Sequence, residues 1–286
     1  MIAAARLRHV GCHISIRQGY AGAARIASAI GASAFQYFPK NPRGLSVKAF
    51  DAGDAAECGA ICRTHGIRSI AHTTYATNLA AEGAIREATI RSLRNDLEIA
   101  EACGSDGVVV HFGKWRAGAD PLAGYRVIIS ALNETLAGWE GSAKLLIENQ
   151  AGEGTSVGAT LEELCTIRNL SSRPDCIGFC LDTCHLFASG VWDGTNWQSV
   201  AENGRRLGFW EHLGAVHLND SAHPSGSRRD RHANIGQGAI GAAAFAEVLR
   251  TPELSGIPVV LETPDPTNMS RQEEIDTVRA LGELES

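Results

Sequence analysis

Hydrophobic residues recur along the chain in eight short runs, each rich in Val, Ile, Leu or Phe. The runs are apolar throughout instead of alternating with polar residues, a pattern typical of parallel strands that are buried on both faces. We therefore predict eight buried strands, at Val10–Ile16, Ala34–Phe38, Ser69–Thr74, Gly107–Gly113, Lys144–Asn149, Gly178–Thr183, Gly214–Asp220 and Pro258–Thr263.

Amphipathic segments alternate with these strands. In Glu82–Cys103 the apolar residues recur at helical spacing, and Gly104 supplies a helix stop directly after them. The other predicted helices are Tyr20–Ile30, Val47–His65, Pro121–Trp139, Leu161–Leu170, Trp197–Trp210, Ala242–Leu249 and Arg271–Leu284.

Eight alternations of strand and helix predict an α/β fold, the (β/α)8 TIM barrel. A doubly wound sheet is the alternative, but no G-x-G-x-x-G loop follows the first strand, which continues through Cys12-His13-Ile14-Ser15. We see no linker and predict a single barrel domain over residues 1–286. In such a barrel the active site lies at the C-terminal ends of the strands.

Composition narrows the class of protein. Hydrophobic residues make up 44% of the chain and charged residues 20%, which argues against global disorder. No run of about 18 apolar residues is present, and the N-terminus lacks the apolar core of a signal peptide. We therefore expect a cytoplasmic protein without a membrane segment. The net charge of −6 argues, taken alone, against a nucleic-acid partner.

Residue types that ligate metals follow six consecutive strands, from the third to the eighth. A long loop after the seventh strand adds two more, in the order Asp-x-His. These candidate ligands are His72, His111, Glu148, Asp182, His185, His217, Asp230, His232 and Glu262. Because the C-terminal ends of barrel strands meet on one face, we expect them to converge.

Charge makes a metal the expected occupant of that face. Glu148, Asp182, Asp230 and Glu262 would repel one another strongly in one cavity, and neutral imidazoles do not compensate them. Two divalent ions would balance the four carboxylates, and three would leave a charge of about +2. A set of His, Asp and Glu without thiolate suits catalytic Zn, Mn or Fe. A positive cluster suits an anionic substrate such as a phosphodiester.

Four segments with these residues resemble the endonuclease IV family of apurinic/apyrimidinic endonucleases, which are trinuclear-zinc TIM barrels. They occur in order on successive strands of the predicted barrel. The segments are Ile147–Gly152, Phe179–His185, His217–Ser221 and Gly226–Gly238.

The resemblance implies three Zn²⁺ ions per chain, with Mn²⁺ as an option in some sites. All nine ligand positions hold the expected residue type. The implied sets are His72, His111 and Glu148 for one zinc, Glu148, Asp182, His217 and Glu262 for a second, and His185, Asp230 and His232 for the third. Three zinc ions would also offset the charge of −6 and place positive charge at the mouth of the barrel.

The implied reaction is hydrolysis of the phosphodiester 5′ to an abasic site in double-stranded DNA. It leaves a 3′-hydroxyl and a 5′-deoxyribose phosphate, and family members also remove blocked 3′ ends. In the implied mechanism a hydroxide near Glu148 attacks phosphorus in line. We take Glu148, Asp182 and Glu262 as the catalytic carboxylates, and we expect a monomer.

By the same resemblance, Arg43 and Tyr75 are expected to contact DNA at the lesion. His13 would contact phosphate or support the metal site. Arg228 and Arg231 would either bind phosphate or brace the loop of metal ligands; the sequence favours neither.

This chain departs from the usual family pattern at Phe112, Leu45, Glu153 and Ala222. None of the four is a predicted ligand. They lie where DNA would be held, so they bear on lesion preference and affinity more than on the chemistry.

A sugar isomerase or epimerase on a related metal-dependent barrel is the alternative function. Glu148, Asp182, His217 and Glu262 around one or two manganese ions would satisfy that pattern. The isomerase has no need of the other five candidate ligands, which therefore discriminate between the two functions.

Overall fold

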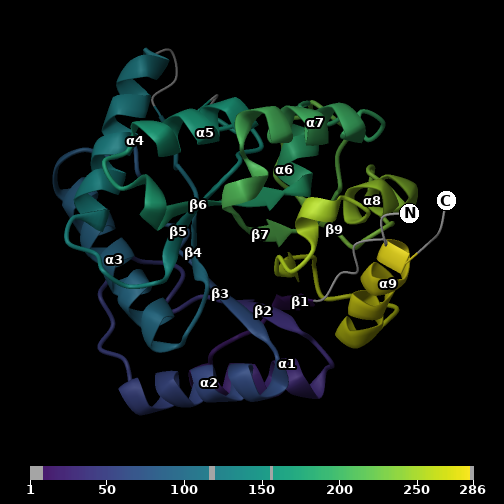
Figure 1. The fold of residues 1–286 in the computed structure, drawn as a ribbon, viewed down its shortest axis with the longest axis horizontal. Coiled ribbons are helices and arrows are strands. Elements are labelled where there is room, and N and C mark those ends of the chain that lie inside the picture. Colours follow the sequence, from purple (N-terminus) through teal and green to yellow (C-terminus); the bar gives the residue numbers. More distant parts are fainter. Residues whose placement is uncertain (1–8, 116–119, 155–156, 284–286) are drawn as a thin grey trace.

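We analysed a computed structural model of the chain, which describes residues 9–115, 120–154 and 157–283. Parallel strands close into a barrel in the order β1-β10-β7-β6-β5-β4-β3-β2, with helices around the outside (Figure 1). The predicted TIM barrel is confirmed. Its strands are β1 (Val10–His13), β2 (Ala34–Tyr37), β3 (Arg68–His72), β4 (Gly107–Val110), β5 (Lys144–Glu148), β6 (Ile177–Asp182), β7 (Leu213–His217) and β10 (Val259–Leu261).

The helices follow the strands and bury their apolar faces against the barrel. None of those in the described ranges is both long and apolar enough to cross a membrane. They are α1 (Gly19–Ala29), α2 (Ala52–His65), α3 (Gly83–Ala102), α4 (Pro121–Leu136), α5 (Leu161–Leu170), α6 (Thr183–Ala188), α7 (Trp197–Leu207), α8 (Ala242–Leu249) and α9 (Arg271–Glu283). Short 3₁₀ turns lie at Pro174–Cys176, Trp210–His212 and Pro252–Leu254.

The start of α2 corrects the predicted helix Val47–His65. The helix begins at Ala52, because the side chain of Asp51 accepts the amides of Gly53 and Asp54 and caps it. Upstream of the cap, the backbone of Lys48 is bonded to a side chain of α3 instead of continuing the helix. At the other end of the chain, residue 284 of the last predicted helix lies outside the described residues.

The sequence did not predict a short helix after β6 or a β-hairpin in the loop after β7. The short helix α6 follows β6 directly, and a hairpin forms from β8 (Asp220–Ser221) and β9 (His232–Ala233) within the long loop after β7. The buried carboxylate of Asp220 accepts the backbone amides of Gly236, Gly238 and Ile240 at 2.9–3.0 Å. These bonds hold the long loop against the end of the barrel.

The inside of the barrel is filled by one layer of small and branched side chains. It consists of Ala34, Ile70, Val109, Leu146, Cys180, Ala215 and Val260, all buried. In β1 the residue in register with Ala34 and Val260 is Gly11. At this level of the barrel β1 contributes no side chain to the interior, because the residue there is Gly11.

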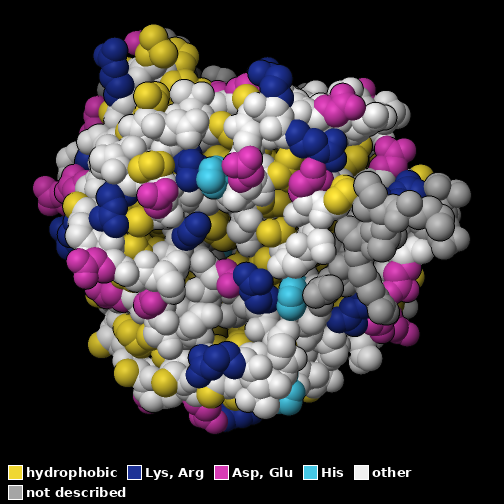
Figure 2. Space-filling view, viewed as in Figure 1, with side chains coloured by type: hydrophobic (Ala, Val, Ile, Leu, Met, Phe, Trp, Pro, Cys, Tyr) yellow, Lys and Arg dark blue, Asp and Glu magenta, His cyan; other side chains and the backbone are white. Residues whose placement is uncertain are grey.

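The surface, seen in the same direction as the ribbon, carries Lys and Arg side chains interspersed with Asp and Glu (Figure 2). No continuous basic area is visible among the described residues on this face.

We expect Gly11→Ala to lower the free energy of unfolding by about 3 kcal/mol, because overpacked cores must shift their backbone. A Cβ atom at Gly11 would lie 1.6 Å from the carbonyl oxygen of Ala34. Gly44→Ala is the control, since nothing lies within 4 Å of its Cβ position, and its effect should stay within about 0.5 kcal/mol. Urea unfolding measures both; equal effects would contradict the packing of β1.

Candidate metal centre

The C-terminal ends of the strands place the candidate ligands. Some of these residues end or directly follow a strand, and the others come from α6 and from the hairpin loop. In the structure the nine side chains lie in one connected group, as the sequence predicted. They are His72, His111, Glu148, Asp182, His185, His217, Asp230, His232 and Glu262.

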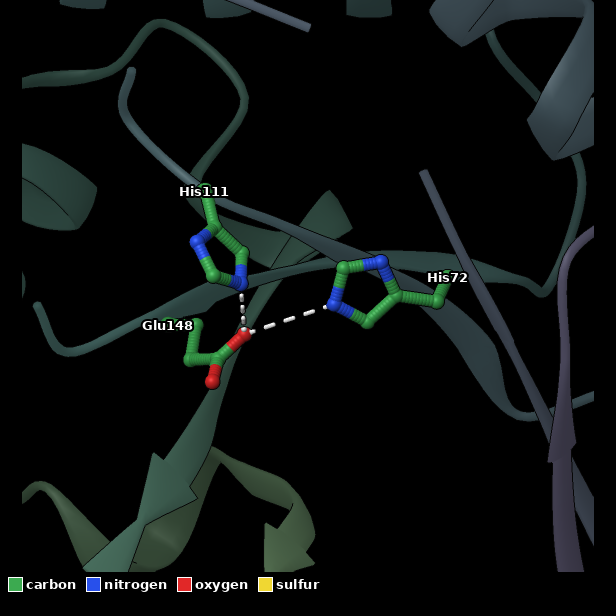
Figure 3. Close-up of side chains that lie close together, drawn as sticks. All are labelled: His72, His111 and Glu148. Carbon is green, nitrogen blue, oxygen red and sulfur yellow. Dashed lines mark ion pairs between the residues drawn. The ribbon is translucent and has the colours of Figure 1, made fainter. Parts of the chain in front are cut away.

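The first cluster joins β3, β4 and β5. The Nε2 atoms of His72 and His111 lie 3.7 and 2.8 Å from the same oxygen, Oε2 of Glu148 (Figure 3). This oxygen is buried and has no hydrogen-bond partner in the described part of the chain. Three ligand atoms within 4.8 Å of one another, one of them an unsatisfied carboxylate oxygen, could hold a metal ion.

A second cluster brings α6 together with the hairpin loop. His185 Nε2 lies 3.2 Å from Oδ2 of Asp230, and His232 Nε2 lies 3.2 Å from Oδ1 of the same carboxylate. His232 Nε2 is buried and makes no hydrogen bond among the described residues. This trio could likewise hold an ion.

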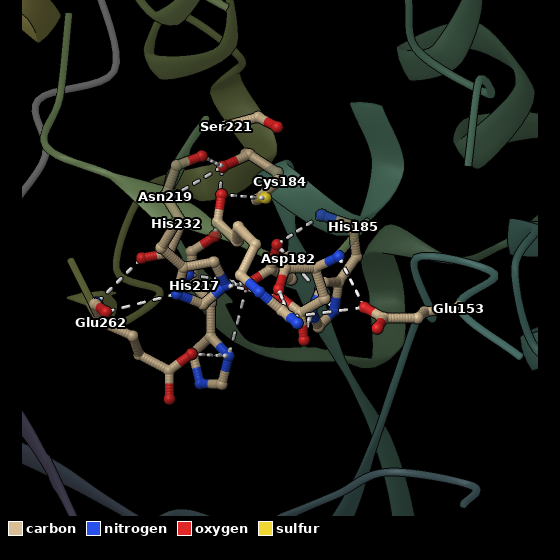
Figure 4. Close-up of polar contacts among 12 residues, drawn as sticks. Glu153, Asp182, Cys184, His185, His217, Asn219, Ser221, His232 and Glu262 are labelled. Carbon is tan, nitrogen blue, oxygen red and sulfur yellow. Dashed lines mark hydrogen bonds and ion pairs between the residues drawn. The ribbon is translucent and has the colours of Figure 1, made fainter. Parts of the chain in front are cut away.

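His217, Asp182 and Glu262 connect the two clusters, and Figure 4 shows them beside His185 and His232 of the second cluster. His217 Nδ1 is 3.1 Å from Glu148 Oε1, 3.2 Å from Glu262 Oε2 and 3.9 Å from Asp182 Oδ2. The two oxygens of Glu148 thus face different partners, which suits a carboxylate shared between two ions. Asp182 Oδ2 is also 3.8 Å from His232 Nε2.

Electrostatics keep two key carboxylates of this group ionised. Burial raises the pKa of Glu148, but His111 and His217 outweigh it and hold the pKa well below its usual value. Burial also opposes ionisation of Glu262, yet His217 and His72 lower its pKa to about 2. Conversely, burial lowers the pKa of His185, but the carboxylates of Asp182 and Asp230 raise it well above normal. Divalent ions could take the place of protons on such imidazoles.

Backbone carbonyls orient three of the imidazoles. Nδ1 of His72 lies 2.8 Å from the oxygen of Thr73, and Nδ1 of His185 lies 2.9 Å from that of Asn149. Nδ1 of His232 lies 3.2 Å from the oxygen of Glu262. Each bond places the proton on Nδ1 and leaves Nε2 free to face the cluster, an arrangement common around metal-bound histidine.

Gln36, which was not among the residues predicted from the sequence, orients His217. This side chain of β2 is fully buried. Its Oε1 lies 2.7 Å from His217 Nε2, and its Nε2 donates to Glu262 Oε1 at 2.6 Å. His217 Nδ1 is thereby left to face the carboxylates. A single amide inside the apolar run Ala34–Phe38 was the available signal.

Two asparagines that follow strands also position ligands. Asn149 bonds both backbone groups of Asp182, accepting its amide at 2.8 Å and donating to its carbonyl at 3.0 Å. Asn219 donates to Asp182 Oδ2 at 2.7 Å and accepts the amide of Glu262 at 2.9 Å. They lie within the motifs that carried the family resemblance, although the sequence assigned them no role.

The residues expected to contact DNA lie beside this centre. Tyr75 is 76% exposed and packs edge-on against Phe38, which also contacts His13. Arg43 is exposed near them, on the segment after β2. Burial lowers the pKa of His13 to about 4, and its Nδ1 lies 3.3 Å from the amide nitrogen of Gln36. A neutral, half-buried His13 matches support of the centre better than contact with phosphate.

Arg231 and Arg228 have different surroundings. Glu153 accepts the amide of Asp230 at 3.0 Å and lies 3.5 Å from the guanidinium of Arg231. These contacts match the alternative in which Arg231 braces the ligand loop. Arg228 is exposed, with a φ of 55°, and its amide donates to the carbonyl of Ala188.

Two cavities open next to the centre. One, of about 510 Å³, is lined by His72, His111, His185 and Asp230 among others. The second, of about 500 Å³, lies between the loops after β1 and β2, and Tyr75 lines both. A ligand at the metal centre could therefore extend toward Arg43, which lines the second cavity.

The chain is similar to known proteins over nearly its whole length. Residues 24–281 match a family described as the xylose isomerase-like TIM barrel. A protein named probable endonuclease 4 from Symbiobacterium thermophilum is 42% identical over 95% of this chain and 99% of its own length. The crystal structure of endonuclease IV from Thermus thermophilus superposes with a TM-score of 0.85 at 34% identity, covering 96% of this chain and 98% of the other. A 3-keto-D-glucoside 4-epimerase from E. coli shares the fold, with a TM-score of 0.68 at 16% identity over 96% and 98% of the two chains.

We expect Gln36→Leu to weaken metal binding by about 10- to 100-fold, because His217 would lose the partner that orients it. Competition with a chromogenic chelator measures the affinity. Gln198→Leu is the matched control, since Gln198 is exposed on α7, away from the centre. An unchanged affinity in Gln36→Leu would show that His217 needs no such partner.

Proposed function

Because this chain belongs to the endonuclease IV family, we propose that it is a zinc-dependent DNA-repair enzyme that hydrolyses the phosphodiester 5′ to abasic sites. The observation that carries this proposal is the convergence of nine ligand-type side chains at one end of the barrel. Four carboxylates in that space require several cations, and cations there favour a phosphodiester as the substrate.

The clusters suggest which residues hold which ion. The first and second clusters each supply three ligands for one ion. The remaining residues supply ligands for a third ion between the two clusters. We assign His72, His111 and Glu148 to one zinc, Glu148, Asp182, His217 and Glu262 to the second, and His185, Asp230 and His232 to the third. Zinc ions so held would lower the pKa of water and stabilise charge on the phosphate and on the leaving oxygen.

We propose that one of the three catalytic carboxylates also serves as the base of the reaction. Of the three catalytic candidates, Glu148 and Asp182 have no exposed side-chain surface, whereas 19% of the Glu262 side chain is exposed. We therefore assign to Glu262 the orientation of the attacking water and acceptance of its proton at Oε2. Gln36 holds the other oxygen and keeps Oε2 directed into the centre.

The isomerase alternative receives no comparable support. Glu148, Asp182, His217 and Glu262 would be sufficient for it, and the likeness to the epimerase is one of fold. The other five candidates form one connected group with those four, as the 2.8 Å contact of His111 with Glu148 illustrates. An isomerase with one or two metal ions would not need His111 as a ligand.

We propose that Arg43, Tyr75 and Arg228 contact DNA, while His13 and Arg231 support the centre. In the part of the chain that the structure describes, no carboxylate pairs with Arg43. Its charge is therefore available to a phosphate. Double-stranded DNA with abasic sites, a monomeric state and a cytoplasmic location remain predictions from the sequence.

Incision of a defined duplex tests the activity. We expect the zinc-loaded protein to cut a duplex with one tetrahydrofuran residue on its 5′ side, leaving a 3′-hydroxyl. His232→Ala or Glu262→Ala should slow incision by more than about a hundredfold, because each removes a ligand. His65→Ala, an exposed histidine of α2, is the control and should cut normally. No incision at full metal occupancy would refute the proposed function.

Metal content tests the ligand assignment separately. Elemental analysis of the purified protein should find close to three metal ions per chain, chiefly zinc, as nine ligands with one bridge would bind. Asp230→Ala should lose about one of them, since it leaves the ligands of the other two ions intact. One or two manganese ions per chain would instead favour the isomerase.

A further inference from the structure

Two opposite charges are buried against each other beside the face proposed to bind DNA. Lys40 Nζ lies 3.0 Å from Asp96 Oδ1, and the two side chains are 2% and 0% exposed. Lys40 also donates to the carbonyl oxygen of Ser92 at 2.6 Å. Lys40 belongs to the segment after β2, and Asp96 and Ser92 belong to α3, so the pair ties this segment to the helix.

Asn95 forms a second tie from the same helix. Its Oδ1 accepts the amide of Lys48 at 2.8 Å, and its Nδ2 donates to the carbonyl of Lys48 at 3.1 Å. One surface of α3 therefore holds residues 40 and 48, the two ends of what we call the 40–48 strap. Neither tie depends on the metal centre.

The free part of this strap carries Arg43. A turn places it, since the Arg43 amide donates to Asn41 Oδ1 at 3.0 Å. Next to it, the carbonyl of Pro42 accepts the amide of Tyr75 at 2.9 Å. The strap therefore presents Arg43 and Tyr75 together, although they follow different strands of the barrel.

The buried pair is a costly way to hold a loop. Burial raises the pKa of Asp96 to about 7, although Lys40 attracts the charged form. Burial likewise lowers the pKa of Lys40. In both residues the effect of burial on the pKa exceeds that of the partner's charge, and buried ion pairs in general add little to stability. The benefit of the charges lies in the position they impose.

We propose that Asp96 and Asn95 are positioning residues that hold the 40–48 strap so that Arg43 and Tyr75 are already arranged for DNA. The inference rests on the proposed function and adds to it how the DNA-contacting loop is ordered. A strap ordered before binding avoids the loss of conformational entropy that binding would otherwise impose. Loss of either tie should therefore weaken substrate binding and leave the chemistry at the metal centre unchanged.

Steady-state kinetics on the tetrahydrofuran duplex test this role. Asp96→Asn and Asn95→Ala should each raise KM about tenfold, change kcat by less than about twofold and leave zinc content unchanged. Val278→Ala, in the buried face of α9, is the control for general destabilisation and should leave KM unchanged. If Asp96→Asn fails to fold because the buried charge of Lys40 has lost its partner, Asn95→Ala tests the same strap without that loss.

A double-mutant cycle shows whether the ties act through Arg43. If they do, Asn95→Ala added to Arg43→Ala should raise KM by less than about twofold, far below the effect of Asn95→Ala alone. Additive effects would overturn the positioning role. If the wild-type enzyme cuts the duplex and the single variants Asp96→Asn and Asn95→Ala have an unchanged KM, that result would overturn it as well. A wild-type enzyme that does not cut this duplex overturns the proposed function itself, which is a different result.

Discussion

Mutual repulsion among four carboxylates at one end of the barrel is the constraint on which the site depends. Glu148, Asp182, Asp230 and Glu262 lie so close that they cannot share this space as isolated anions. Imidazoles are interleaved among them, and each carboxylate lies within 4 Å of at least one. The same interleaving connects the first and second clusters, because Glu148 lies 3.1 Å from His217 and Asp182 lies 3.8 Å from His232. The arrangement that separates the negative charges is therefore the same arrangement that places the candidate ligands around possible metal sites.

Around these ligands, uncharged groups decide how each one points. Backbone carbonyls hold His72, His185 and His232, while the amide of Gln36 holds His217. Asn149 and Asn219 connect neighbouring strand ends, so the barrel itself is the support of the centre. Rigid strands make this precision possible, because a ligand on a mobile loop would lose it.

The loops are held in place in a different way from the ligands on the strands. The ligand loop after β7 is anchored by the Asp220 carboxylate and by Glu153, and the 40–48 strap is anchored on α3. In both cases a charged side chain binds backbone or a buried partner, and Glu153 binds the backbone amide of Asp230, which is itself a candidate ligand. Exposed residues such as Arg43 and Tyr75 then stay free for a substrate while their backbone is held.

The sequence by itself was sufficient for the barrel and for the list of candidate ligands, because buried parallel strands are apolar throughout and their ends carry the chemistry. It misjudged the start of α2, where Asp51 caps the helix locally and the contact of Lys48 with Asn95, visible only in the tertiary structure, holds the chain upstream of the cap. It also missed Gln36, whose partners lie 181 and 226 positions away in the chain. Local patterns report the burial of a residue, whereas its partner across the barrel is decided only when the sheet closes.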